Sequence, residues 1–177
     1  MFSFDNALFL LVNASNSTPS WLLTLARLVS QELVQWLIAG AVGALVVGDA
    51  QVRRRVLQIS LGMAIAWIGA RLIQHVLPMP RPFTLGLGTR WLSHADSASF
   101  PSTHASVAFA FAAVVAANTQ HRLLGVCAFV LAGMIGWSRI SLGLHFPSDI
   151  VAGALVGLAS SWLARRFPRR TPALSAT

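Results

Sequence analysis

The chain has 177 residues, of which 55% are hydrophobic and only 10% are charged. Soluble domains carry charges at roughly a quarter of their positions, so this composition excludes an ordinary soluble domain and indicates an integral membrane protein. The formal net charge is +8, but the arginines gather in short clusters between apolar runs and not along one face. That distribution argues against a nucleic-acid-binding protein.

The first segment, residues 7–28, is apolar overall but is interrupted by polar residues between Asn13 and Pro19. Such a profile suits lipid exposure poorly, because polar groups that lack a partner are costly in hydrocarbon. We therefore expect residues 1–29 to form two short helices that lie at the membrane interface. A sixth membrane span in this region is the alternative.

Five apolar stretches follow, each close to the ~20 helical residues that cross a bilayer. They cover residues 30–48, 55–77, 103–118, 122–141 and 148–166. The sequence thus predicts an all-α fold, a polytopic membrane bundle of about five transmembrane helices, or six with the N-terminal segment. We expect residues 1–170 to form a single integral-membrane domain and residues 171–177 to form a disordered tail.

Clusters of arginine predict the orientation of these spans. They are Arg53 to Arg55, Arg122, and the group Arg165, Arg166, Arg169 and Arg170. All three positions fall on one side of the bundle, and the positive-inside rule assigns that side to the cytoplasm. The opposite helix ends therefore face outward, together with the longest connection, about 78–102. Loops of this length in compact domains are usually functional or mobile.

Three polar motifs border apolar runs on the outward side. In chain order they are Arg81-Pro82, Pro101-Ser102-Thr103-His104, and Ser138-Arg139 followed by His145 and Asp149. Charged groups cost from about 2.5 kcal/mol upward at the bilayer centre, so their convergence at helix ends requires an explanation. Phosphoryl transfer supplies one, because its transition state spreads negative charge over three equatorial oxygens that need fixed donors.

The third motif suits a nucleophile. Asp149 lies four residues after His145 and would orient it, so that a neutral imidazole attacks phosphorus and forms a phosphohistidine. His104 would protonate the departing oxygen. A metal site built from these three residues is disfavoured, because the two nearby arginines would repel a cation.

The remaining motif residues suit phosphate binding. Arg81 and Arg139 would supply bidentate donors. Ser102 would add its hydroxyl, and backbone N–H groups around Thr103, at the start of a helix, would add the positive end of the helix dipole. Because the arginines neutralise the charge, neither a metal nor another cofactor is required. Taken alone, each motif has a plainer explanation, such as a helix cap or an arginine that reaches toward headgroups.

The order and spacing of the three motifs resemble those of the type-2 phosphatidic-acid phosphatase superfamily. Within it, the start LFLLVNAS and the blocks HVLPMPRPF and SFPSTHAS look most like the bacitracin-resistance type of undecaprenyl-diphosphate phosphatase. The resemblance implies a multi-pass protein of the bacterial cytoplasmic membrane, a site that faces the periplasm or the outside, and a polyprenyl diphosphate lipid as substrate. It also implies His145 as nucleophile, Asp149 as its partner, His104 as acid, and Arg81, Ser102, Thr103 and Arg139 as phosphate ligands.

One position departs from the superfamily pattern. The first motif of the superfamily begins with a lysine seven residues before the arginine, and here that position is Gln74 in a chain without any lysine. Arg71 and His75, on the same helix end, are the candidates to replace it. Arg71 is three residues from Gln74 and so neighbours it on a helix, whereas His75 faces elsewhere.

Three functions compete at this point. The first is removal of the terminal phosphate from undecaprenyl diphosphate, for recycling of the carrier in cell-wall building. The second keeps the chemistry but uses another lipid, such as phosphatidylglycerol phosphate or lipid A phosphates, or transfers the phosphoryl group to a lipid. The third, a non-enzymatic membrane component, is disfavoured because transport alone does not need this arrangement of histidine, aspartate and arginines.

Overall fold

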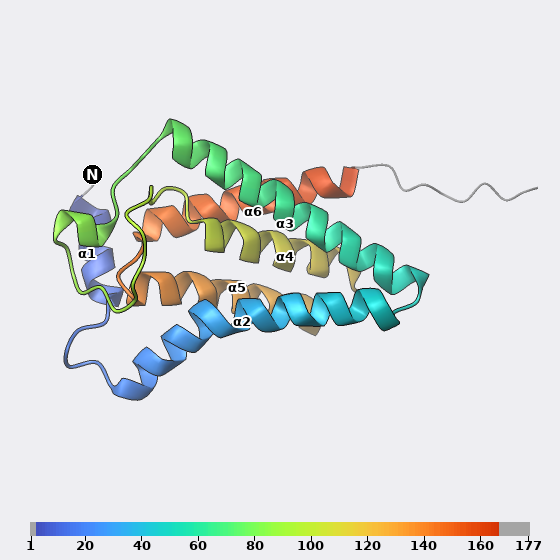
Figure 1. The fold of residues 1–177 in the computed structure, drawn as a ribbon, viewed down its shortest axis with the longest axis horizontal. Helices are drawn as coiled ribbons and strands as arrows, with labels where there is room; N and C mark the ends of the chain where they lie inside the picture. The colour runs from blue at the N-terminus through green and yellow to red at the C-terminus, as the bar shows by residue number, and fades with distance from the viewer. Residues whose placement is uncertain (1–2, 167–177) are drawn as a thin grey trace, which may run out of the picture.

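Five long helices run side by side in the computed structural model, which describes residues 3–166 (Figure 1). They are α2 (Ser20–Val47), α3 (Ala50–Val76), α4 (Thr103–Asn118), α5 (Arg122–Ser141) and α6 (Pro147–Arg166). A short helix, α1 (Ser3–Val12), precedes them, and a 3-10 helix, η1 (Pro82–Leu85), lies in the long connection between α3 and α4. Residues 3–166 include no strand, and the predicted all-α bundle is confirmed. The predicted disordered tail lies outside the described residues.

Three of the helices, α3, α5 and α6, are long and apolar enough to cross a membrane. The apolar α4 has only 16 residues, which at 1.5 Å per residue makes it about 24 Å long. Large apolar side chains such as Leu123 and Leu155 are highly exposed on the outside of the bundle. Such side chains are unfavourable in water and favourable in lipid. The chain is therefore a multi-pass membrane protein.

The N-terminal region differs from the expectation in one respect. The first short helix is present as α1, but no second short helix ends before residue 30, because α2 runs without interruption from Ser20 to Val47. Pro19 stands at the N-cap of α2 with a φ of −55°. Proline lacks the backbone N–H that would continue a helix on its N-terminal side, so α2 begins after Pro19, and no proline follows before Val47.

Helix α1 is held at the end of the bundle by hydrogen bonds to distant residues. Asp5 accepts hydrogen bonds from the backbone N–H and the hydroxyl of Ser148, at 3.0 and 2.6 Å. Asn13 donates to the carbonyls of Thr89 and Ser141, at 3.0 and 3.1 Å. Figure 1 shows α1 and the α3–α4 connection at the same end of the bundle. These contacts join the start of the chain to the start of α6 and to the long connection.

Helix α4 lies in the middle of the bundle, against α3, α5 and α6. Its buried face consists mainly of alanines. On the facing side of α6, a Cβ added at Gly157 would overlap the backbone of Ser106 and Ala110 on α4. Small residues on both helices thus allow the two backbones to approach closely, which is a common arrangement in membrane bundles. This packing fixes the start of α4 next to the start of α6, where the polar motifs lie.

Candidate active site

The three polar motifs meet at the end of the bundle that carries α1. Ser102 caps α4, and its backbone N–H donates to the carbonyl of Asp149 at 3.0 Å. Between α5 and α6 the chain reverses at Gly143, which has a φ of +79°. A side chain at Gly143 would be strained by this φ and would overlap the carbonyl of Thr89. The tight reversal brings His145 back toward the end of α5.

His145 lies next to a carboxylate. Its Nδ1 lies 3.3 Å from Oδ2 of Asp149. The same oxygen accepts hydrogen bonds from the Ser99 hydroxyl at 2.5 Å and from the backbone N–H of Phe146 at 2.9 Å. The carboxylate is therefore fixed by three donors. Sequence reasoning did not identify Ser99, because one serine in a serine-rich loop carries no distinguishing signal.

The other ring nitrogen of His145 faces a cation. Its Nε2 lies 3.1 Å from Nη1 of Arg81. A guanidinium can only donate hydrogen bonds, so Nε2 must accept and the ring proton must lie on Nδ1, toward Asp149. His145 thus presents a lone pair at Nε2, which is the form of imidazole that a nucleophile requires.

Electrostatics favour the same neutral form. Burial and the positive charges of Arg81 and Arg139 hold the pKa of His145 well below its usual range. The ring is only 1% exposed, so water does not screen these charges. A neutral imidazole is therefore the expected state at neutral pH.

Arg81 uses all five of its N–H donors within the protein. Nε donates to the carbonyl of Ser97 at 2.9 Å, and Nη2 donates to the Ser97 hydroxyl and the Ala98 carbonyl at 3.2 and 3.1 Å. Nη1 donates to the Leu144 carbonyl at 2.9 Å in addition to its contact with His145. Arg81 therefore positions the loop before Ser99 and the histidine together. A phosphate bound here would have to replace one of these contacts.

Arg139 differs, because most of its donors have no partner. Its Nη1 donates to the Ser30 hydroxyl of α2 at 2.7 Å. Among the described residues, its Nε and Nη2 have no hydrogen-bond partner, although the residue is only 2% exposed. Leaving buried donors unpaired costs free energy, and a charged group costs the most. An anion next to Arg139 would remove this cost.

A polar pocket of about 360 Å³ opens in front of His145. It is lined by Trp67, Arg71, Gln74, Arg81, His94, Ser97, Thr103, His104 and His145. The predicted residues Ser102 and Arg139 are not among these lining residues, and both are buried. Ser102 accepts the backbone N–H of Ala105 as the cap of α4. Burial lowers the pKa of His94, so this ring also favours the neutral state.

The residues considered as replacements for the missing lysine lie in different surroundings. Gln74 is buried and donates to the carbonyl of Pro101 at 2.9 Å and to the hydroxyl of Thr103 at 3.0 Å. Arg71 donates to the amide oxygen of Gln74 at 3.1 Å. Both residues line the polar pocket, whereas His75 is exposed and does not. Helix α3 thus brings one cation, Arg71, to the pocket, in addition to Arg81 from the long connection.

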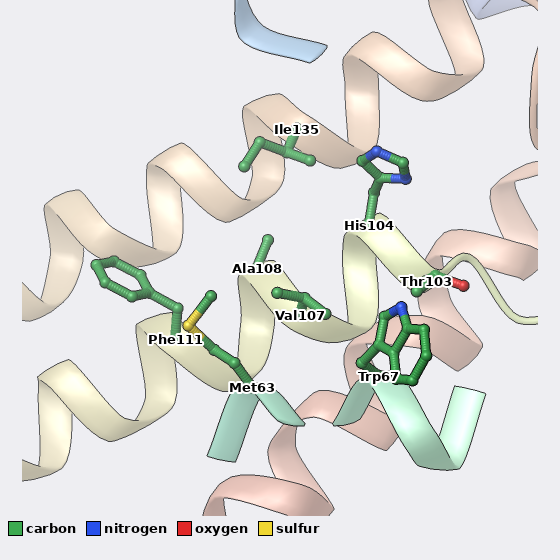
Figure 2. Close-up of a pocket in the computed structure, with 8 residues that line it drawn as sticks. All are labelled: Met63, Trp67, Thr103, His104, Val107, Ala108, Phe111 and Ile135. Carbon is green, nitrogen blue, oxygen red and sulfur yellow. The ribbon is translucent and has the colours of Figure 1, made fainter. Parts of the chain in front are cut away.

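An apolar groove of about 250 Å³ continues from the polar pocket (Figure 2). It is lined by Met63, Trp67, Thr103, His104, Val107, Ala108, Phe111 and Ile135. Trp67, Thr103 and His104 line both cavities. Figure 2 shows these three at one end of the groove and Met63 and Phe111 at the other. The site therefore combines a polar pocket with an adjoining apolar groove.

No group of three or more His, Cys, Asp and Glu side chains within residues 3–166 is arranged to hold a metal ion. In the polar pocket, charge is supplied by arginines instead. The arrangement of an imidazole lone pair, guanidinium groups and a second histidine, His104, can carry out phosphoryl transfer from a phosphate ester or anhydride.

Comparisons with known proteins agree with this chemistry. A family model described as the PAP2 superfamily matches residues 55–172. The Escherichia coli (strain K12) protein named "Putative undecaprenyl-diphosphatase YbjG" is 35% identical over 153 residues, which are 86% of this chain and 76% of that protein. Undecaprenyl-diphosphatase BcrC of Bacillus subtilis (strain 168) is 31% identical over 120 residues, which are 68% of this chain and 61% of that protein.

A solved structure shares the fold. The crystal structure of Aquifex aeolicus LpxE matches with a TM-score of 0.77 at 24% sequence identity, and the match covers 94% of this chain and 97% of that one. At this identity the likeness shows the fold alone. Together with the family model, it confirms the resemblance expected from the three motifs. The chain belongs to the PAP2 superfamily and is a multi-pass membrane phosphatase.

Proposed function

We propose that the protein removes the terminal phosphate of undecaprenyl diphosphate and releases undecaprenyl phosphate and inorganic phosphate. The observation that carries this proposal is the position of His145 in a polar pocket that adjoins an apolar groove. Asp149 contacts Nδ1 of this ring, which leaves the lone pair on Nε2. An amphiphilic substrate fits such a site, because its headgroup and its hydrocarbon chain need opposite surroundings. The names of the two relatives above favour a polyprenyl diphosphate over other lipids.

In the first step, Nε2 of His145 attacks the terminal phosphorus. An N–P bond forms, the bond from phosphorus to the bridging oxygen breaks, and that oxygen keeps the electron pair. His104 donates a proton to the departing oxygen, so that undecaprenyl phosphate leaves. Asp149 stabilises the positive charge that develops on the ring of His145.

In the second step, water attacks the phosphohistidine. His104 has lost its proton and accepts one from the water, while the N–P bond breaks and phosphate leaves. His145 returns to its neutral form with the ring proton still on Nδ1. The two steps together consume one water and regenerate both histidines.

Fixed donors stabilise the transferred phosphoryl group. Arg81, which lines the polar pocket, can donate after it releases the Nε2 of His145, and the unpaired donors of Arg139 can join it when the phosphate contacts them. Backbone N–H groups at the start of α4, around Thr103, add a positive dipole end. Ser102 supports them by capping this helix. These groups provide the charge neutralisation without a metal ion.

The arginine clusters favour a site on the outer face of the bacterial cytoplasmic membrane. Arg53 to Arg55 begin α3, Arg122 begins α5, and Arg165 and Arg166 end α6. Figure 1 shows the α2–α3 turn and the end of α6 away from α1, at the end of the bundle opposite the candidate site. The positive-inside rule assigns that end to the cytoplasm.

The test is phosphate release by purified, detergent-solubilised protein from undecaprenyl diphosphate and from phosphatidylglycerol phosphate, with EDTA present. We expect rapid release from the polyprenyl substrate that EDTA does not reduce. His121→Ala, at an exposed position on the other end of the bundle, should match the wild type. Preference for the glycerolipid would contradict the proposed substrate, and dependence on a divalent metal would contradict the mechanism.

A further inference from the structure

We infer that Arg71 binds the phosphate that remains on the lipid, and that it makes the enzyme selective for diphosphates over monophosphates. This inference rests on the proposed function and assigns a role that the three motifs leave open. It concerns the one position where this chain lacks the cation that its superfamily pattern provides, Gln74.

The first argument is position. The attacked phosphate must contact Nε2 of His145, and we place the start of the hydrocarbon chain in the apolar groove. The retained phosphate of a diphosphate lies between the two, and therefore where the polar pocket meets the groove. Trp67, which lines both cavities, marks this junction on α3. Arg71 lines the polar pocket and lies four residues after Trp67, which is one helical turn on the same face.

The second argument is burial. His145 and Arg81 are 1% and 3% exposed, whereas Arg71 is exposed to solvent. The polar pocket thus has cations at two depths. The inner one contacts the nucleophile, and the outer one lies nearer the surface, away from the attacked phosphorus. Two phosphates in sequence need two such sets of donors.

The third argument is the state of the Arg71 guanidinium. Its one side-chain hydrogen bond among the described residues goes to the Gln74 amide oxygen. Gln74 is in turn anchored to Pro101 and Thr103, so the guanidinium is tethered to the start of α4. A guanidinium has five donors, so four remain for a ligand.

The fourth argument is charge. None of the residues that line the polar pocket is acidic. Within residues 3–166, no carboxylate lies in salt-bridge distance of Arg71, since the one salt bridge there joins His145 to Asp149. A cation without a counter-ion at the mouth of such a pocket attracts an anionic ligand. Gln74 acts here as a positioning residue that orients Arg71 through its amide.

The experiment compares hydrolysis of a prenyl diphosphate and of the prenyl monophosphate with the same chain. In Arg71→Gln, kcat/KM for the diphosphate should fall about 10- to 100-fold, mainly through KM, because a charge-assisted contact to the retained phosphate is lost. The value for the monophosphate should stay near that of the wild type. Arg71→Lys, which keeps the charge, should lose less, and Gln74→Met should show the same selective loss to a smaller extent.

Arg55→Gln is the matched control, because it removes the same charge from an exposed position at the far end of α3. An equal fall for both substrates in Arg71→Gln, or no fall for the diphosphate, would overturn the inference. Binding of inorganic pyrophosphate and of orthophosphate tests it without turnover. Arg71→Gln should weaken pyrophosphate binding alone, and this result remains measurable if the wild type hydrolyses neither lipid and the proposed function fails.

Discussion

The two ends of the bundle carry the same residue type in opposite surroundings. At the end opposite α1, arginines such as Arg54 and Arg122 are exposed and solvated. At the α1 end, Arg81 and Arg139 are almost fully buried, and Arg139 leaves two nitrogens unpaired. Exposed arginines cost little and determine topology, whereas buried ones cost free energy that only a ligand or a dense hydrogen-bond network offsets. The difference supports the proposal that the α1 end is the functional one.

The largest effect should come from the nucleophile. His145→Ala removes the imidazole whose Nε2 lone pair faces Arg81, so phosphate release should fall at least about a thousandfold. His121→Ala, at the other end of the bundle, should leave the rate unchanged. The measurement is the steady-state rate on undecaprenyl diphosphate. A variant that retains most of its activity would show that another group attacks phosphorus.

The second largest effect on activity should come from the buried Arg139. Arg139→Gln removes the unpaired donors and should lower kcat about 100-fold or more, as loss of one preorganised donor to a developing charge does. The same substitution at Arg55 tests the comparison between the two ends and should change kcat little. If Arg139→Gln and Arg55→Gln lose activity equally, the buried position of Arg139 does not contribute to catalysis.

The apolar groove should show a smaller, substrate-dependent effect. Val107→Trp fills the groove next to His104. Each buried CH2 contributes about 0.8 kcal/mol, so excluding two of them should raise KM for a long prenyl diphosphate about tenfold. A short, water-soluble diphosphate should be hydrolysed as before. Val46→Trp, at a position that is 68% exposed on α2, provides the control. An effect of Val107→Trp on both substrates would contradict a role in chain binding.

The smallest effect concerns pH. Below its pKa, His145 is protonated and cannot attack, so kcat/KM should fall only well below pH 6.5, the ordinary value for histidine. The charge of Arg81 helps to lower the pKa of His145, so Arg81→Gln should raise this pKa. The pH below which kcat/KM of the variant falls should then increase by about one unit. The profile of kcat/KM against pH measures this shift. A downward shift would contradict the assigned electrostatics.

Much of this molecule could be predicted from its sequence, for identifiable reasons. The helices α3 to α6 coincide with apolar stretches whose ends carry charged residues or proline. This pattern can be recognised from neighbouring residues alone. The motif residues were identifiable because ionisable residues are rare within membrane segments, so three motifs in a fixed order and spacing on one side of the bundle are informative. The site assignments stay predictions until the variants above are measured.

The remainder depends on contacts between distant parts of the chain. Asp5 and Ser148, whose pairing holds α1 on the bundle, are separated by 143 positions and leave no periodic signal. Ser99 and Ser30 form hydrogen bonds with Asp149 and Arg139, but a serine in a polar loop or within a helix looks ordinary in sequence. The continuity of α2 is not apparent in the sequence, because the polar residues Ser30, Gln31 and Glu32 separate two apolar segments, although none of them breaks a helix.

The most direct test of the account is transfer of label from undecaprenyl diphosphate with a radioactive terminal phosphate to the protein in a rapid quench. We predict that the wild type acquires a label that is stable in base and labile in acid, as a phosphohistidine is, that the label maps to His145, and that His145→Ala acquires none. Label on another residue, or equal labelling of His145→Ala, would contradict the assignment of His145 as the nucleophile.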